Sequence, residues 1–249
     1  MLLRGPLSLL FWLFVACSSF LLFPIALAIW ALSAPFDRRR ALLHRFTCFW
    51  ASLYTWLNPA WPVEIVGREH LDPKQTYVLV ANHLSLLDIL VLFRLHAHFK
   101  WVSKHSNFRV PLIGWNMHLN RYIPLRRGDR ESVKQMLAQA EQTLRAGNSL
   151  MIFPEGTRSR DGALRPFKAG AFELALKTGL PLLPIALSGT FEALPRRGVV
   201  LRGRHPIRVE LLPPTPPEAY EGQSAEALME TTRGRILAAL EGEGSPAPR

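Results

Sequence analysis

The chain opens with a long apolar segment that carries no charged residue between Gly5 and Phe36. A helix needs about 20 apolar residues to cross the hydrocarbon core of a bilayer. The segment therefore predicts a membrane-anchoring helix, which either spans the bilayer or enters one leaflet as a bent limb, because Pro24 lies inside it. A cleaved signal peptide is the alternative, but the segment is too long for the apolar region of a signal and only Arg4 precedes it.

A second helix is predicted over residues 38–57, where apolar side chains recur with helical spacing and Arg45 and Ser52 lie on the other face. Because aromatic residues dominate the apolar face, we interpret this segment as a helix that lies in the membrane interface. Packing of the same face against the protein explains the pattern equally. The basic cluster Arg38–Arg40 predicts that the rest of the chain lies on the cytoplasmic face of the membrane, which in a bacterium is the inner membrane. The apolar positions are Leu42, Phe46, Phe49, Trp50, Leu53 and Leu57.

Short apolar runs then alternate with amphipathic segments over residues 59–215, which predicts one α/β domain with a largely parallel sheet flanked by helices. Residues 1–58 are predicted to form the membrane-anchoring helices, and residues 216–249 a C-terminal helix and a disordered tail. Strands are predicted at Tyr77–Ala81, Lys100–Ser103, Tyr122–Leu125, Ser149–Phe153, Leu182–Leu187 and Ile207–Leu212. Helices are predicted at Leu86–Leu95 and over residues 131–146, 168–178 and 224–240, with a linker at Pro213–Pro217 and disorder over the last nine residues.

The composition adds a strong positive charge to this pattern. The chain has 249 residues, of which 49% are hydrophobic, and a formal net charge of +11. Such a chain suits nucleic acid or an anionic membrane surface, and the apolar N-terminus favours the membrane. Cys17 and Cys48 lie in apolar helical segments without an activating base nearby, so neither a disulfide nor a thiol nucleophile is predicted. His96 and His98 lack a Cys or acid at ligand spacing, so no metal site is predicted.

Two polar clusters follow directly after predicted buried strands. Asn82 and His83 come after the strand that ends at Ala81, and residues 154–160 come after the strand that ends at Phe153. In open α/β sheets, ligands bind beyond the carboxyl ends of the strands. The two clusters are therefore candidates for a single site at one edge of the sheet.

His83 and Asp88 suit a general base and its carboxylate partner. If His83 lies on a loop and Asp88 in the first helical turn, the carboxylate can fold back to the imidazole, fix its tautomer and stabilise the imidazolium. His83 is then placed to take a proton from a hydroxyl group. The same residues also suit a simple helix start, with Ser85 as N-cap and Asp88 as capping-box acid, and the two interpretations are compatible.

Basic side chains near these clusters suit a phosphate group. Lys104 and Arg127 follow predicted strands, and Arg158 offers a guanidinium fork. Glu155 stands beside Gly156, which allows close approach of the backbone. Taken singly, each of these residues also fits a solvated turn or a surface charge.

The combination of Asn82-His83 and Asp88 with the run Phe153-Pro154-Glu155-Gly156-Thr157-Arg158-Ser159 resembles the PlsC-like 1-acyl-sn-glycerol-3-phosphate acyltransferase family, from about residue 60 to residue 190. The resemblance implies direct transfer of a fatty acyl group from acyl-ACP or acyl-CoA to the sn-2 hydroxyl of lysophosphatidic acid, giving phosphatidic acid without a cofactor. It implies membrane lipids, and no nucleic acid, as partners. It also implies roles for individual residues: His83 and Asp88 in catalysis, Lys104, Arg127, Glu155, Gly156, Thr157 and Arg158 in substrate binding, and Leu183-Pro184-Ile185 near the acyl chain.

One motif departs from the family pattern. Asn120 stands where glycine is common and Arg126 where an acid is common, so another lysolipid acceptor stays open. A lipid hydrolase acting through Ser85 or Ser188 is a second possibility, but the chain has no Gly-x-Ser-x-Gly sequence. A non-catalytic membrane protein that binds anionic lipid or nucleic acid is a third.

Overall fold

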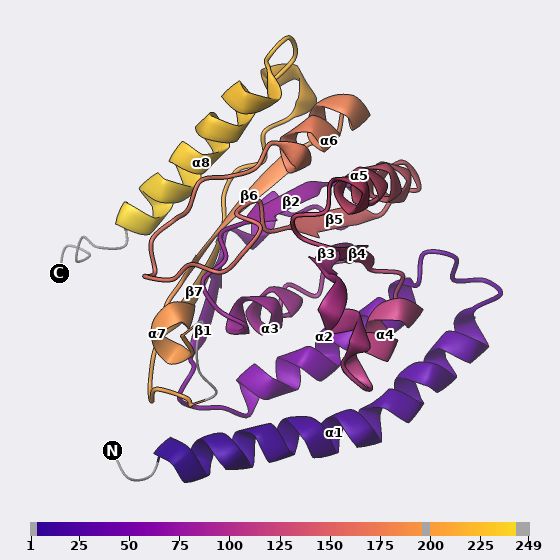
Figure 1. Ribbon diagram of the computed structural model, residues 1–249, viewed down its shortest axis with the longest axis vertical. Coiled ribbons are helices and arrows are strands. Elements are labelled where there is room, and N and C mark those ends of the chain that lie inside the picture. Colours follow the sequence, from indigo (N-terminus) through magenta and orange to yellow (C-terminus); the bar gives the residue numbers. More distant parts are fainter. Residues whose placement is uncertain (1–3, 196–199, 243–249) are drawn as a thin grey trace.

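The computed structural model describes residues 4–195 and 200–242, which fold into a seven-stranded sheet flanked by helices (Figure 1). The order of the strands is β1-β7-β6-β2-β5-β3-β4, and every neighbouring pair is parallel except β6 and β7. The prediction of a largely parallel sheet is therefore confirmed. The strands are β1 (Val63–Val66), β2 (Val78–Ala81), β3 (Phe99–Lys104), β4 (Ile123–Leu125), β5 (Ser149–Ile152), β6 (Leu182–Ser188) and β7 (Ile207–Leu211).

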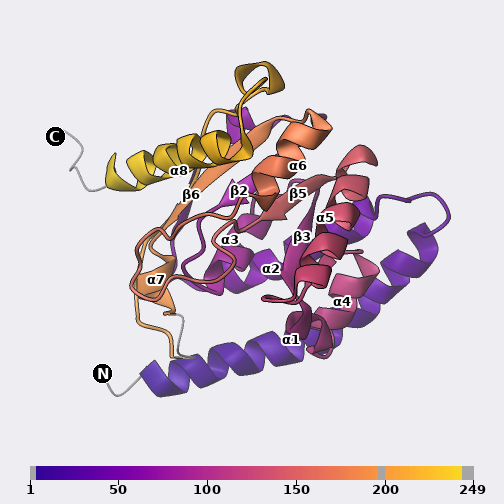
Figure 2. The same cartoon turned by 45° about the horizontal axis from the view of Figure 1, so that its top comes forward.

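Helices cover both faces of the sheet, because successive residues of its central strands point to opposite sides. Val78 and Val80 of β2 pack in a core with α5, α6 and α8, whereas Leu79 and Ala81 pack in a second core with α2 and α3. Figures 1 and 2 show these two layers, with α1 along the outer side of the second. The helices are α1 (Arg4–Ser33), α2 (Ala41–Trp56), α3 (Leu87–Phe93), α4 (Ile113–Leu119), α5 (Arg130–Arg145), α6 (Gly170–Thr178), α7 (Thr190–Ala193) and α8 (Ala225–Gly242).

Helix α1 is long and apolar enough to cross a membrane by length and composition. It continues through Pro24 as one helix and curves around α2 and α4 (Figure 1). The predicted apolar segment reached Phe36, but the helix ends at Ser33. Large apolar side chains on its outer face stay exposed, including Phe20, which is 72% exposed.

Helix α2 buries polar and apolar side chains together on its protein-facing side, including Leu43 and, from the predicted apolar face, Trp50. His44, Thr47 and Ser52 are buried against the domain, whereas Leu42 and Phe49 of the predicted apolar face are nearly half exposed. The helix therefore departs from a water-facing amphipathic helix, in which polar side chains face solvent and apolar ones face the core. The helix starts at Ala41 rather than at residue 38, because the carboxylate of Asp37 accepts hydrogen bonds from the backbone N–H groups of Ala41 and Leu42.

Several elements were not predicted. Strand β1 is only four residues long, and the exposed Glu64 interrupts its apolar residues, as an edge strand allows. Helix α4 is short and includes Gly114 and Asn116 at buried positions. Helix α7 and the 3₁₀ turns Arg68–His70, His105–Arg109 and Pro217–Ala219 are also additions. Of the last nine residues, which were expected to be disordered, the first two belong to α8 and the other seven lie outside the described residues.

Candidate active site

The two polar clusters predicted from the sequence lie together at the carboxyl edge of the sheet. Their strands, β2 and β5, are hydrogen-bonded neighbours. Strand β6 pairs with β2 on its other side, and the side chain of Asn82 joins the two ends: its amide donates to the carbonyl of Leu187 at 2.9 Å, and its oxygen accepts from the N–H of Leu187 at 2.7 Å. The loop after β6 thereby becomes a third wall of the site.

His83 and Asp88 form the pair that the sequence predicted. His83 Nδ1 lies 2.7 Å from Asp88 Oδ2, and the carboxylate is fully buried. The same oxygen accepts hydrogen bonds from the backbone N–H groups of Leu84 at 2.6 Å and Ser85 at 2.8 Å. The imidazole stacks on the ring of Phe153, with centroids 3.9 Å apart. The local turn therefore presents three donors to one oxygen and holds the histidine in place.

The start of α3 differs in detail from the prediction. Leu86, rather than Ser85, occupies the N-cap position, and its side chain has no capping group. The Ser85 hydroxyl accepts from the N–H of Leu87 at 3.2 Å and donates to the carbonyl of Leu194 at 2.5 Å. Asp88 does bond the N–H of Ser85, as a capping-box acid would. Helix initiation and support of the imidazole are thus performed by the same carboxylate.

Glu155 supports the histidine loop from the neighbouring strand. Its carboxylate is buried, with 4% of the residue exposed, and accepts from the N–H of His83 at 2.6 Å and of Arg165 at 3.3 Å. Burial raises the pKa of the Glu155 carboxyl to about 7, and the bond from His83 partly opposes this change. These contacts position backbone, and the binding of substrate by Glu155 stays a prediction.

We expect the protonation of Glu155 to make stability depend on pH. The carboxyl has an ordinary pKa of 4.5 and a folded-state pKa of about 7, so the folded chain binds more protons between these values. The free energy of unfolding should therefore fall by about 3 kcal/mol as the pH rises through this window. Denaturant unfolding in detergent, followed by tryptophan fluorescence, should show this loss in the wild type and a flatter curve in Glu155→Gln.

Replacement of an exposed glutamate, Glu173→Gln on α6, is the matched control and should leave the pH dependence as it is in the wild type. Parallel curves for Glu155→Gln and the wild type would contradict the assignment of this titration to Glu155.

An apolar cavity of about 420 Å³ opens beside His83. Lys104, at the end of β3, and Arg127, after β4, line the same cavity. Its other walls come from α1, α2, α3 and α4, with side chains that include Phe11, Trp50, Leu90 and Met117. Such a space can hold an acyl chain, with a base and two cationic side chains beside it.

The remaining predicted residues lie around this cavity rather than in its lining. Gly156, Thr157 and Arg158 are on the loop after β5, which is tied to the histidine loop because the N–H of Ser159 donates to the His83 carbonyl at 2.8 Å. Leu183-Pro184-Ile185 is the buried centre of β6 and does not line the cavity. These assignments stay predictions.

Thr190 is a site residue that the sequence reasoning missed. Its hydroxyl donates to Asp88 Oδ1 at 2.5 Å, and both residues are fully buried. The available signal was its place: Thr190 follows the predicted buried strand that ends at Leu187, as His83 and Glu155 follow theirs. Without a charged or ring side chain, however, Ser188-Gly189-Thr190 looks like an ordinary turn.

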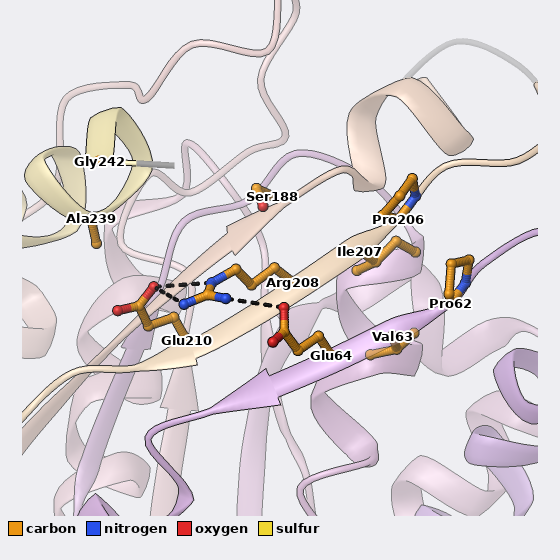
Figure 3. Close-up of a pocket in the computed structure, with 10 residues that line it drawn as sticks. All are labelled: Pro62, Val63, Glu64, Ser188, Pro206, Ile207, Arg208, Glu210, Ala239 and Gly242. Atoms are coloured by element: carbon orange, nitrogen blue, oxygen red, sulfur yellow. Dashed lines mark hydrogen bonds and ion pairs between the residues drawn. The ribbon is translucent and has the colours of Figure 1, made fainter. Parts of the chain in front are cut away.

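A second groove, of about 780 Å³, lies beside the β1 edge of the sheet (Figure 3). In it the guanidinium of Arg208 lies between the carboxylates of Glu64 at 3.0 Å and Glu210 at 3.3 Å. Ser188 lines this groove and not the cavity that holds His83, and the hydroxyl of Ser85 is buried and donates to a backbone carbonyl. Neither serine is therefore placed as the nucleophile that a hydrolase needs.

Comparisons with known proteins identify the family of this chain. The family model described as Acyltransferase matches residues 62–188. The chloroplastic 1-acyl-sn-glycerol-3-phosphate acyltransferase of Brassica napus is 37% identical over 207 residues, which are 82% of this chain and 58% of that protein. A 1-acyl-sn-glycerol-3-phosphate acyltransferase of Chlamydomonas reinhardtii is 44% identical over 162 residues, which are 64% of this chain and 48% of that protein. The chain thus spans about half the length of these curated relatives.

A solved structure shows the same fold. The crystal structure of the 1-acyl-sn-glycerophosphate (LPA) acyltransferase PlsC from Thermotoga maritima superposes with a TM-score of 0.78 and 22% sequence identity, and the match covers 99% of this chain and 100% of that one. The family match covers the strands from β1 to β6 together with His83, Asp88 and Glu155. The chain belongs to the acyltransferase family.

Proposed function

We propose that the protein transfers a fatty acyl group from an acyl thioester to the sn-2 hydroxyl of 1-acyl-glycerol-3-phosphate, giving phosphatidic acid. The observation that carries the proposal is the His83–Asp88 pair, with 2.7 Å between Nδ1 and Oδ2, at the wall of an apolar cavity that Lys104 and Arg127 also line. His83 suits the deprotonation of a hydroxyl group, the apolar cavity suits an acyl chain, and the two cationic side chains suit a phosphate group. The named activity of the relatives supports this choice of substrate.

In the proposed mechanism, His83 donates Nδ1–H to Asp88, so that Nε2 on the other side of the ring accepts a proton from the acceptor hydroxyl. The hydroxyl oxygen then forms a bond to the thioester carbonyl carbon. When the tetrahedral intermediate collapses, the carbon–sulfur bond breaks and the imidazolium returns its proton to the leaving thiolate. Asp88 stabilises the imidazolium between these steps.

The cationic residues are proposed to hold the phosphate of the acceptor. Lys104 ends strand β3 and Arg127 follows strand β4. The two strands are parallel neighbours, so both side chains lie at the same edge of the sheet and line the cavity. Arg158 is proposed as a third contact from the loop after β5. Guanidinium and ammonium groups bind phosphate through charge-assisted hydrogen bonds, which fix the glycerol hydroxyl relative to His83.

The exposed apolar face of α1, α2 and α4 is proposed to lie in the membrane, with the catalytic domain on the cytoplasmic side. Leu42 and Phe49 of α2 and Ile113 and Trp115 of α4 extend the exposed apolar surface of α1. A contiguous apolar face of this kind marks a membrane or protein contact. The substrate is itself a membrane lipid, so this placement brings the cavity to the acceptor.

A panel of lysolipid acceptors tests the substrate assignment. Purified protein in lipid vesicles should acylate lysophosphatidic acid faster than lysophosphatidylcholine, lysophosphatidylethanolamine or monoacylglycerol, with products identified by mass for both acyl-CoA and acyl-ACP. Arg127→Ala should reduce this preference about tenfold or more, because a charged hydrogen bond contributes about 1.5–3 kcal/mol.

Arg130→Ala, an exposed arginine at the start of α5, is the control and should keep the wild-type preference. Equal rates for lysophosphatidic acid and monoacylglycerol would contradict a phosphate-bearing acceptor, and a faster rate with another lysophospholipid would assign that acceptor instead.

A further inference from the structure

We infer that Thr190 is a positioning residue of the catalytic pair, which holds the Asp88 carboxylate so that the imidazole of His83 presents an unprotonated Nε2 to the acceptor. This inference rests on the proposed function of His83 as general base. Thr190 lies just beyond the part of the chain that the family model matches, and it touches Asp88 rather than the cavity.

The carboxylate of Asp88 has its two oxygens assigned to different donors. Oδ2 takes three N–H groups, from the His83 ring and from the backbone of Leu84 and Ser85. Oδ1 takes the hydroxyl of Thr190 at 2.5 Å. Because Asp88 is fully buried, the two sets of donors fix both the charge and the plane of the carboxylate.

The position of Thr190 is itself fixed by the fold. Gly189 before it has φ of 79°, and a Cβ atom there would lie 1.9 Å from the carbonyl oxygen of Pro206, so only glycine fits. At the other end of α7, the carbonyl of Leu194 accepts the Ser85 hydroxyl at 2.5 Å. Two hydrogen bonds, from Thr190 and to Leu194, therefore join α7 to the turn that carries His83.

The chemical consequence follows from removing the hydroxyl. Without Thr190 Oγ1, one oxygen of a buried carboxylate lacks its donor, so the carboxylate of Asp88 can rotate and its hydrogen bond with Nδ1–H of His83 weakens. The hydrogen bond to the carboxylate holds the ring proton on Nδ1, so when that bond weakens the proton can move to Nε2. The ring would then have no free lone pair at the nitrogen that must accept the hydroxyl proton.

Thr190→Val, which keeps the shape of the side chain, should lower kcat by about 10- to 100-fold, the range known for partners that orient metal-ligating side chains, and leave KM for both substrates within about threefold. Thr190→Ser keeps the hydroxyl and should retain kcat within about threefold. Thr232→Val is the matched control: this buried threonine of α8 bonds its hydroxyl to the carbonyl of Leu228 and should keep wild-type kcat.

The second measurement needs no substrate. In ¹⁵N-histidine-labelled protein in detergent, the ring signals of His83, assigned by their loss in His83→Gln, should show the Nδ1–H tautomer in the wild type and Thr190→Ser. Thr190→Val should show the Nε2–H tautomer or a mixture. If Thr190→Val does not fold, Thr190→Ala takes its place, because alanine is smaller and fits the same space. Thr190→Ala should show the same change of tautomer.

The inference is overturned if the tautomer is unchanged in both Thr190→Val and Thr190→Ala, or if Thr190→Ser loses as much kcat as Thr190→Val. Failure of the wild type to acylate any lysolipid would instead overturn the proposed function. The tautomer comparison in the resting protein would still decide whether Thr190 positions the pair.

Discussion

The His83→Ala variant is expected to lose acyl transfer by a factor of about a hundred to ten thousand, the usual contribution of a general base. Nδ1 of the histidine is committed to Asp88, and the ring lines the apolar cavity. Alanine removes the proton acceptor and leaves the rest of the cavity wall. The measurement is transfer from a labelled acyl thioester to lysophosphatidic acid in purified vesicles.

His205→Ala is a suitable control, because this residue lies in the segment before β7 and does not line the cavity. Lysolipid binding should be retained in both variants, since His83 is proposed to act on the hydroxyl rather than on the phosphate. Undiminished transfer by His83→Ala would remove this residue from the mechanism. Equal binding by the variant and the wild type, with turnover in neither, would support a non-catalytic lipid-binding protein.

The Asp88→Asn variant is expected to lose activity by about a thousand- to ten-thousandfold, as asparagine does at the corresponding position of other histidine–carboxylate pairs, while it keeps most of its stability. The amide oxygen can accept the same N–H groups that Oδ2 accepts, and the amide NH₂ can donate to the hydroxyl of Thr190. What disappears is the negative charge that stabilises the imidazolium.

Asp88→Ala separates the two roles of this carboxylate. It leaves the N–H groups of Leu84 and Ser85 without their acceptor in a buried turn, and each loss costs about 1–3 kcal/mol. Denaturant unfolding should therefore show a clear loss for alanine and a small one for asparagine, with kcat low in both. Asp72→Asn, an exposed aspartate in a turn, is the control. Wild-type kcat in Asp88→Asn would show that the charge is not needed.

The central strands and the His83–Asp88 pair were predictable because the information is local. Buried strands such as β2 and β5 are continuous apolar runs, and His83 and Asp88 are separated by a single turn and the start of a helix. The prediction that both polar clusters lie at one edge of the sheet followed from the rule that ligands bind beyond the carboxyl ends of parallel strands. The pairing of Asp88 with Thr190 was not predictable in this way, because 102 residues separate them.

The role of Glu155 could not be predicted for a different reason. An acid in a polar loop suits substrate binding and a backbone contact equally well, and only the register between β2 and β5 brings its carboxylate to the N–H of His83. Helix α4 was not predicted because it is short and because asparagines such as Asn116 and Asn120 are typical of loops. In the structure both asparagines donate hydrogen bonds to the hydroxyl of Thr47 on α2, a contact that the sequence does not indicate.

The walls of the cavity also show how closely the N-terminal helices and the α/β domain depend on each other. Side chains of α1 and α2, such as Phe11 and Trp50, enclose the same space as His83 and Lys104. The N-terminal helices are therefore part of the candidate site as well as the proposed attachment to the membrane. A chain that began at residue 59, or one that carried a foreign anchor, would keep His83 and lose one side of the cavity that His83 lines. If α1 attaches the protein to the membrane as proposed, the same helix both holds the protein there and encloses part of the cavity.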